Sequence, residues 1–154
     1  MNEIKILSVN IRSLLPKKEE LKNYCIKNRV DIINIQESWI NKNKRDPIIS
    51  QYQTITNKNE NEKGSGLVTF ISNKLKYKIL NISNTKDLFV NKKKMSIGNI
   101  YIHPGYNPAK ITRINDILEK IPRIDLLTGD FNAHNRNWSP KSNRMGTIVD
   151  FRTN

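Results

Sequence analysis

The chain has 154 residues, enough for one domain with a real core but not comfortably for two. Its 27 Lys and Arg against 14 Asp and Glu give a formal net charge of +13, which favours a polyanionic partner such as nucleic acid, although a coding sequence rich in A and T would also raise the lysine content. No apolar run approaches the ~18 to 20 residues of a membrane span, and the single cysteine excludes an internal disulfide.

The first part of the chain predicts a strand, a helix and a second strand. Apolar residues at 4–10 predict a strand that is largely buried, and those at 31–37 predict the next one. Between them, 16–28 predict a helix, so the two strands are expected to be parallel. Cys25 lies in the apolar stripe of this helix and is expected to be a reduced, buried thiol. The stripe consists of Leu21, Tyr24, Cys25 and Asn28.

The middle of the chain predicts further strands. Residues 52–56 are a short strand, and 95–102 a longer one that follows a basic turn. The runs at 66–71 and 77–82 are expected to form consecutive antiparallel strands around the turn at 72–74.

The last part of the chain predicts a helix followed by a strand. Asn107 is a suitable N-cap, Pro108 suits the first helical position, and Pro122 ends the helix. The strand at 124–127 follows, and residues 146–151 resemble the start of another element. Because strands and helices mix throughout, we expect one α/β domain over 1–154, with sheets covered by helices.

Polar side chains follow three of the predicted strands where each strand ends. Asn10, Glu37 and Asp130 hold these positions. Asp130, Asn132 and His134 alternate along the chain, so an extended backbone would point them to the same side. Polar groups at the carboxyl ends of strands are the layout that open α/β sheets use for ligand sites.

Asn10, Glu37 and Asp130 are oxygen donors, which suit a hard cation such as Mg²⁺. Zinc would call for a set of His and Cys, and two His with one Cys offer little for one. Taken singly, an Asp after Gly is usually a turn residue, and a Glu at a strand end is usually solvated. Their coincidence at three strand ends favours a metal site.

Aromatic and imidazole side chains near these positions have alternative roles. Tyr101 ends a strand, where it is either a core residue or a hydrogen-bond donor to a phosphate oxygen. Trp39 and Trp138 are expected to pack at the bases of loops, with stacking on a nucleic-acid base as the second choice. His103 and His134 are expected to be structural or loop residues rather than general bases.

Five motifs occur in order over almost the whole chain. They are Val9-Asn10-Ile11-Arg12-Ser13-Leu14, Asp31-Ile32-Ile33-Asn34-Ile35-Gln36-Glu37-Ser38-Trp39, Gly64-Ser65-Gly66-Leu67-Val68, Ile100-Tyr101-Ile102-His103-Pro104 and Gly129-Asp130-Phe131-Asn132-Ala133-His134 with Trp138. Together they resemble the endonuclease/exonuclease/phosphatase superfamily, in particular the abasic-endonuclease-like domain of non-LTR (LINE-type) retrotransposons.

The resemblance implies a four-layer α/β sandwich, in which two mainly antiparallel sheets pack together with helices outside. It implies that Glu37 holds a divalent metal, Mg²⁺ or alternatively Mn²⁺, with Asn10 beside it. Asp130 would orient or deprotonate the attacking water, while Asn132 and Tyr101 would grip the scissile phosphate. The reaction would nick a DNA strand and leave a 3′ hydroxyl that a reverse transcriptase extends. Because the N-terminus runs straight into a strand pattern without a secretory signal, we expect the protein to be intracellular, and nuclear when it acts on DNA.

The chain departs from this family at its end. Family members finish with a further strand pair and a Ser-Asp-His-type motif, whereas nothing after His134 contains a histidine and the only later acid is Asp150. We therefore expect a domain that lacks its C-terminal part, with weak or absent nuclease activity. Two alternatives remain: a catalytically inactive nucleic-acid-binding remnant, and a small-molecule phosphatase of the same fold. The charge and the motif around Asp130 favour DNA.

Overall fold

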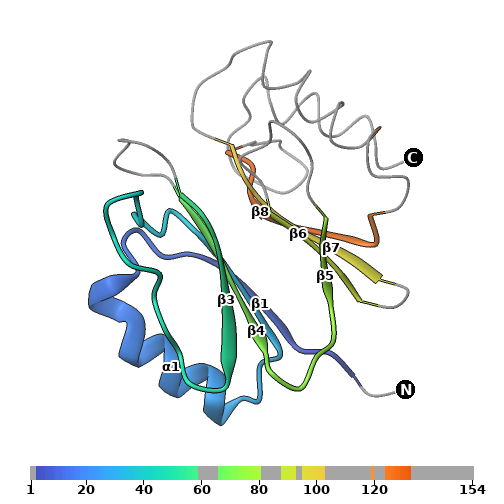
Figure 1. Ribbon diagram of the computed structural model, residues 1–154, viewed down its shortest axis with the longest axis horizontal. Coiled ribbons are helices and arrows are strands. Elements are labelled where there is room, and N and C mark those ends of the chain that lie inside the picture. Colours follow the sequence, from blue (N-terminus) through green and yellow to red (C-terminus); the bar gives the residue numbers. More distant parts are fainter. Residues whose placement is uncertain are drawn as a thin grey trace, which may run out of the picture.

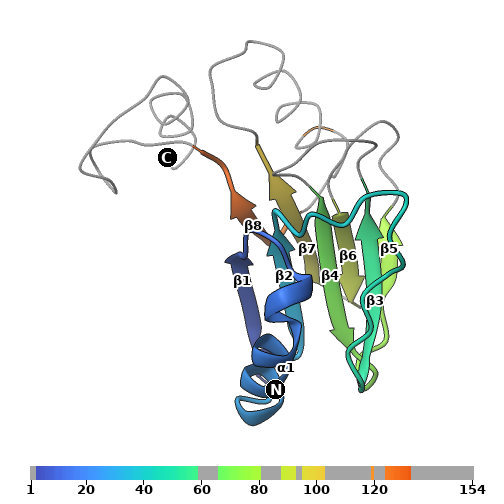
Figure 2. The same ribbon diagram turned by 90° about the vertical axis from the view of Figure 1, so that its left-hand side faces the viewer.

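Two four-stranded sheets pack face to face in the computed structural model, which describes residues 3–58, 66–80, 88–92, 95–102, 119 and 124–132 (Figures 1 and 2). The strands are β1 (Ile6–Asn10), β2 (Ile32–Gln36), β3 (Tyr52–Asn57), β4 (Leu67–Ser72), β5 (Lys78–Leu80), β6 (Leu88–Lys92), β7 (Met95–Tyr101) and β8 (Leu126–Asp130). The first sheet has the order β1-β2-β4-β3 and the second β5-β6-β7-β8.

Both sheets are mixed, and each contains one parallel and two antiparallel pairs of neighbouring strands. β1 pairs with β2, and β7 with β8, in parallel, whereas the other pairs of neighbours are antiparallel. The predicted α/β class with two mainly antiparallel sheets is confirmed, as is the parallel pairing of the first two strands. The predicted helix that begins at Asn107 lies outside the described residues except for Glu119, and the predicted element at 146–151 lies outside them entirely.

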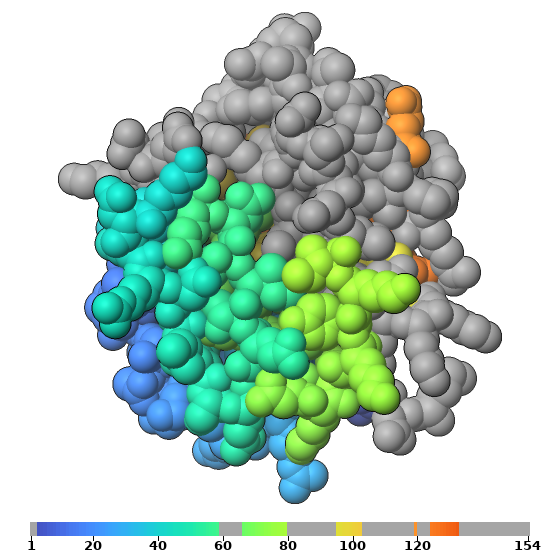
Figure 3. Space-filling view, in the orientation of Figure 1, coloured from blue at the N-terminus to red at the C-terminus, as the bar shows by residue number. Residues whose placement is uncertain are grey.

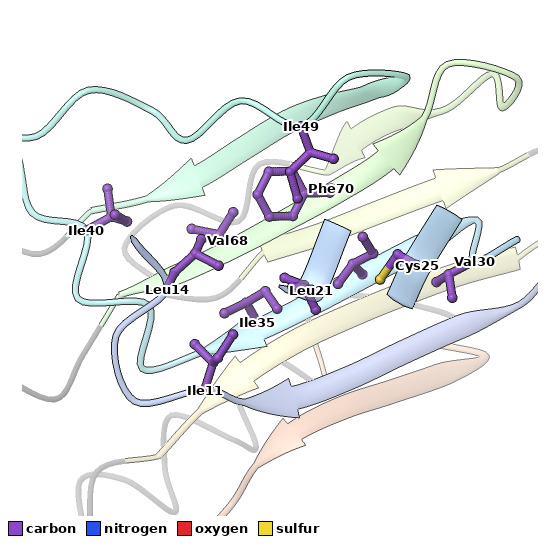
Figure 4. Packing of buried hydrophobic residues seen from close by; sticks show 11 residues of the cluster. Ile11, Leu14, Leu21, Cys25, Val30, Ile35, Ile40, Ile49, Val68 and Phe70 are labelled. Carbon is purple, nitrogen blue, oxygen red and sulfur yellow. The ribbon is translucent and has the colours of Figure 1, made fainter. Parts of the chain in front are cut away.

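Helix α1 (Lys18–Lys27) covers the outer face of the first sheet and follows a short 3-10 helix, η1 (Leu15–Lys17). Leu21 and Cys25 are its buried residues, and they pack against side chains of β2 and β4 such as Phe70 (Figure 4). The predicted buried thiol is confirmed. Within the described ranges, no helix is long and apolar enough to cross a membrane.

The predicted stripe of α1 is too wide. Tyr24 is 53% exposed, and Asn28 is also exposed. Leu21 and Cys25, one turn apart, are the residues that face the sheet, because a single short helix packed on a sheet buries only a narrow strip.

The two runs at 66–71 and 77–82 do not pair with each other, so that prediction is wrong. β4 already has β2 on one side and β3 on the other, and therefore offers no free edge to the next strand. The chain instead crosses to the second sheet, where β5 pairs with β6. β6 itself was not predicted, because its five residues include the start of the basic stretch that resembled a turn.

The segment that carries β3 and the one that leads into β5 adjoin on one face of the molecule (Figure 3). The Tyr77 hydroxyl, just before β5, donates to Gln53 Oε1 on β3 at 2.7 Å. Tyr77 and Leu75 also pack against the apolar cluster that lies between the sheets. At the opposite side of the sandwich, β1 is the edge strand of the first sheet as far as the structure describes it. It is therefore only partly buried, less than the sequence predicts.

The layer between the sheets changes character along the strands. At one end lie Ile32, Ile71 and Ile97, which form a buried apolar cluster. Two residues further along β2 and β7 lie Asn34 and Asn99, each 1% exposed. Residues two apart on a strand face the same way, so this face turns from apolar to polar within a few residues.

Candidate active site

Four strands bring polar side chains to the same end of the sandwich. Asn10, Tyr101 and Asp130 are the last residues of β1, β7 and β8, and Glu37 directly follows β2. β1 and β2 are parallel, as are β7 and β8, so the carboxyl ends of each pair meet. Since the sheets pack face to face, the two ends lie opposite each other.

The Asn10 carboxamide joins the two sheets at this end. Its Nδ2 donates to Glu37 Oε1 and to Asp130 Oδ2, each at 2.7 Å. Both carboxylates therefore lie around one nitrogen. Hydrogen bonds to carboxylates are stronger than those between neutral groups. The structure thus brings together three residues that the sequence placed at separate strand ends.

Glu37 has a left-handed backbone that the surrounding loops hold in place. Its φ is +49°, a conformation that non-glycine residues adopt at a cost. The Ser13 amide donates to the Glu37 carbonyl oxygen at 2.9 Å, and the Ser38 amide to the Gly66 carbonyl oxygen at 3.0 Å. A Cβ at Gly66 would lie 2.8 Å from Ser38 Oγ, so the glycine allows this close packing.

Tyr101 contributes a neutral phenol. Its hydroxyl donates to Glu37 Oε1 at 3.3 Å. Burial, the charge of Glu37 and this hydrogen bond raise the pKa of Tyr101 to about 12, with a further contribution from Asp130, while the charge of Arg12 opposes the rise. The phenol therefore keeps its proton at neutral pH and can donate it in a hydrogen bond.

Asp130 is oriented by a turn directly after β8. The Asn132 amide N–H donates to Asp130 Oδ1 at 2.9 Å, and Asn132 Nδ2 donates to the Ile102 carbonyl oxygen at 2.6 Å. Asn132 has a φ of +46°, so the chain is no longer extended there and the predicted alternation of side chains ends at Asp130. The predicted contact of Asn132 with a phosphate stays a prediction.

Gly129 lets β8 approach β7 closely. A Cβ at this position would lie 1.9 Å from the Ile100 carbonyl oxygen, and the φ of +151° also favours glycine. One position further along the parallel pairing of β7 with β8, Tyr101 lies opposite Asp130. The glycine before Asp130 thus serves strand pairing rather than the turn that the sequence suggested.

The other predicted residues divide into two groups. His103, His134 and Trp138 lie outside the described residues. Trp39 is 37% exposed and has a φ of +57°, so most of its surface is covered at the turn after β2, and its role as a packing residue stays a prediction.

Arg12 is a site residue that the sequence reasoning missed. It is exposed, has a φ of +46°, and lies close enough to Tyr101 for its charge to lower that pKa. Its position two residues after Asn10 was the available signal, since a cation beside carboxylates at a strand end is suited to an anionic ligand.

The donor set fits a hard divalent cation. Glu37 and Asp130 offer carboxylate oxygens, and the buried Asn10 Oδ1 has no hydrogen-bond partner among the described residues. Oxygen ligands of this kind, with one or two carboxylates, are what Mg²⁺ requires. The residues that would hold the ion are those expected from the sequence, and its binding stays a prediction.

Comparison with protein-family models gives no match, and comparison with curated proteins gives none either. Solved structures do match. The endonuclease domain of TRAS1, a telomere-specific non-LTR retrotransposon, is 16% identical, with a TM-score of 0.75 over 96% of this chain and 70% of that one. An AP endonuclease from Archaeoglobus fulgidus is 16% identical, with a TM-score of 0.62 over 85% and 58%. The 3′ phosphatase NExo from Neisseria, bound to a product DNA hairpin, is 17% identical, with a TM-score of 0.60 over 85% and 58%.

These similarities establish the fold. The chain has the α/β fold of endonuclease/exonuclease/phosphatase proteins, and the predicted resemblance to that superfamily and to a retrotransposon endonuclease domain is confirmed as a likeness of structure. The chain spans 58% to 70% of the length of these three structures.

Proposed function

We propose that this chain is a metal-dependent phosphodiesterase of the DNA endonuclease type, which nicks target DNA for retrotransposon reverse transcription. The observation that carries the proposal is the Asn10 carboxamide, which holds Glu37 and Asp130 around one point at the ends of four strands. The likeness to nucleases of the same fold supports it.

The proposed reaction assigns a separate task to each side chain. Glu37 and Asn10 hold the divalent cation, which when bound supplies positive charge against the extra negative charge of the five-coordinate phosphorus. Asp130 orients the water and accepts its proton as the water oxygen bonds to phosphorus. The bond from phosphorus to the 3′ oxygen breaks, and the 3′ oxygen takes a proton from solvent water, leaving a 3′ hydroxyl and a 5′ phosphate. Tyr101 donates its hydroxyl hydrogen to a phosphate oxygen.

DNA is the substrate that the charges support best. The formal net charge is +13, and the charge of Arg12 reaches Tyr101 in the site. The likeness to a 3′ phosphatase that was solved with a DNA hairpin points the same way. A small-molecule phosphatase would not need so large a positive charge.

Plasmid nicking tests the proposal. We expect purified protein, at concentrations near those of the DNA, to nick supercoiled plasmid slowly in Mg²⁺ and not in EDTA. Glu37→Gln should lower the rate by 10²-fold or more, because it removes a charged ligand. Glu20→Gln is the matched control, since Glu20 is an exposed carboxylate on α1, and it should leave the rate unchanged.

Two outcomes would decide for the alternatives. Salt-sensitive DNA binding that is unaffected by Mg²⁺ and by Glu37→Ala, without any nicking, would identify an inactive binding protein. Hydrolysis of a soluble phosphomonoester in preference to plasmid would identify a small-molecule phosphatase. Nicking at ordinary nuclease rates would contradict the expected weak activity.

A further inference from the structure

The layer between the sheets contains buried polar side chains that no step above uses. Asn34, Thr69 and Asn99 are each 1% exposed, and Gln36 is 2% exposed. Buried amides and hydroxyls lower stability unless they are hydrogen-bonded. Isoleucines occupy the layer between the sheets a few residues away. Apolar side chains could therefore have occupied the positions of these polar side chains as well.

These side chains form one continuous series of hydrogen bonds across the sandwich, which we call the relay. Gln36 Nε2 donates to Asn99 Oδ1 at 2.6 Å, and Asn99 Nδ2 donates to Thr69 Oγ1 at 3.2 Å. Thr69 Oγ1 donates to Asn34 Oδ1 at 2.8 Å, and Asn34 Nδ2 to Thr128 Oγ1 at 2.7 Å. Thr128 Oγ1 then donates to a main-chain carbonyl of β7 at 3.0 Å. Every bond runs in the same direction.

The relay crosses between the sheets repeatedly. Gln36, Asn34 and Thr69 belong to β2 and β4 of the first sheet, whereas Asn99 and Thr128 belong to β7 and β8 of the second. Hydrogen bonds are directional, whereas apolar contacts tolerate sliding of one sheet over the other. A series in which each donor meets a particular acceptor therefore favours one register of the two sheets.

Both ends of the relay lie next to the site. Gln36 directly precedes Glu37, and Thr128 lies two residues before Asp130 on the same face of β8. In the pairing of β7 with β8, Asn99 is opposite Thr128 just as Tyr101 is opposite Asp130. A shift between the sheets would therefore displace the site carboxylates and break the relay together.

We propose that the relay residues Gln36, Asn99, Thr69, Asn34 and Thr128 are positioning residues that set the distance between Glu37 on the first sheet and Asp130 on the second. They act through the Asn10 carboxamide, which bonds both carboxylates only at the correct spacing. The inference rests on the proposed function only where it treats these carboxylates as an active site. The positioning itself is a property of the fold.

NMR of the Asn10 side-chain amide tests the relay without metal, DNA or catalysis. The signals are identified by their loss in Asn10→Ala. In the parent protein, the two carboxamide protons should be shifted from free-amide values and protected from exchange with water. Thr128→Val keeps the shape but removes the hydroxyl, so it should move both signals toward free-amide values and speed exchange by tenfold or more. Thr128→Ser keeps the hydroxyl and should restore the parent signals.

A control and a second variant separate positioning from general destabilisation. Ile97→Val lies in the apolar part of the same layer, and it should lower the melting temperature while leaving the Asn10 signals unchanged. Thr69→Val, on a strand that carries no site residue, should move the Asn10 signals as Thr128→Val does; if it fails to fold, the half-buried Thr128→Val still decides. Unchanged Asn10 signals in Thr128→Val would overturn the inference. Parent protein that lacks Mg²⁺-dependent nicking, but whose Asn10 signals respond in this way, would overturn the proposed function and retain the relay.

Discussion

Arg12 lies close enough to Tyr101 for its positive charge to oppose the rise of that phenol's pKa. Its left-handed φ of +46° turns the chain directly after Asn10, and the side chain is exposed. Among the described residues it has no ion-pair partner. A guanidinium in this position is suited to a phosphate of the proposed DNA substrate.

Arg12→Ala should weaken DNA binding at every sequence alike and reduce the salt dependence by about one phosphate contact. Arg29→Ala is the matched control, because Arg29 is also exposed with a positive φ of +54° but lies at the opposite end of β2. Fluorescence anisotropy with a labelled duplex, measured over a series of salt concentrations, gives both slopes. Equal slopes for the two variants would contradict the role of Arg12.

Tyr101 should give the site a distinct phenol titration in alkaline solution. Its pKa is raised to about 12, so the folded protein holds this proton between pH 10 and 12 while the unfolded chain has lost it. The resulting stabilisation is full below pH 10 and is lost as the pH rises through 12. Ultraviolet titration of the phenols should show a component near pH 12 that Tyr101→Phe removes. Loss of a component near pH 10 instead would mean that the hydroxyl is not held by Glu37.

Among the elements, β8 depends most on a single residue. At Gly129 a methyl group would meet the Ile100 carbonyl oxygen of β7, and no rotation of a side chain could relieve that contact. Gly129→Ala should therefore lower the free energy of unfolding by about 1–3 kcal/mol or separate the end of β8 from β7. Leu126→Ala, at a position of the same strand that is 38% exposed, should change stability by less than about 0.5 kcal/mol. Thermal melts of both variants measure the difference.

The elements also show where sequence periodicity was sufficient. β1, α1 and β2 were predicted because each has an unbroken apolar pattern of its own, and local pattern decides such elements. The pairing of 66–71 with 77–82 failed, because it depends on β2 and β3 occupying both edges of β4, which neighbouring residues do not encode. The width of the buried stripe on α1 failed for the same reason: it depends on the extent of the sheet beneath.

Across the whole molecule, the sequence predicted the residues of the site but not the buried polar residues that support it. Asn10, Glu37 and Asp130 stand out because each interrupts or ends an apolar strand. Asn34 and Asn99 lie inside strands, where a polar residue only looks like an interruption of the apolar pattern of the strand. Their purpose becomes visible only when two sheets, distant in sequence, are placed together. The available signal was that a second polar residue lies two positions further along the strand from Asn34 and from Asn99.

The Asn10 bridge has a consequence for the order of events during synthesis. Its bond to Asp130 spans 120 positions of the chain, so the two carboxylates cannot face each other until β8 has left the ribosome and docked. A nascent polypeptide that has completed only the first sheet already carries Asn10 and Glu37 yet lacks the second carboxylate that the Asn10 carboxamide bonds. The full arrangement of the three side chains must therefore arise late, when translation has delivered β8.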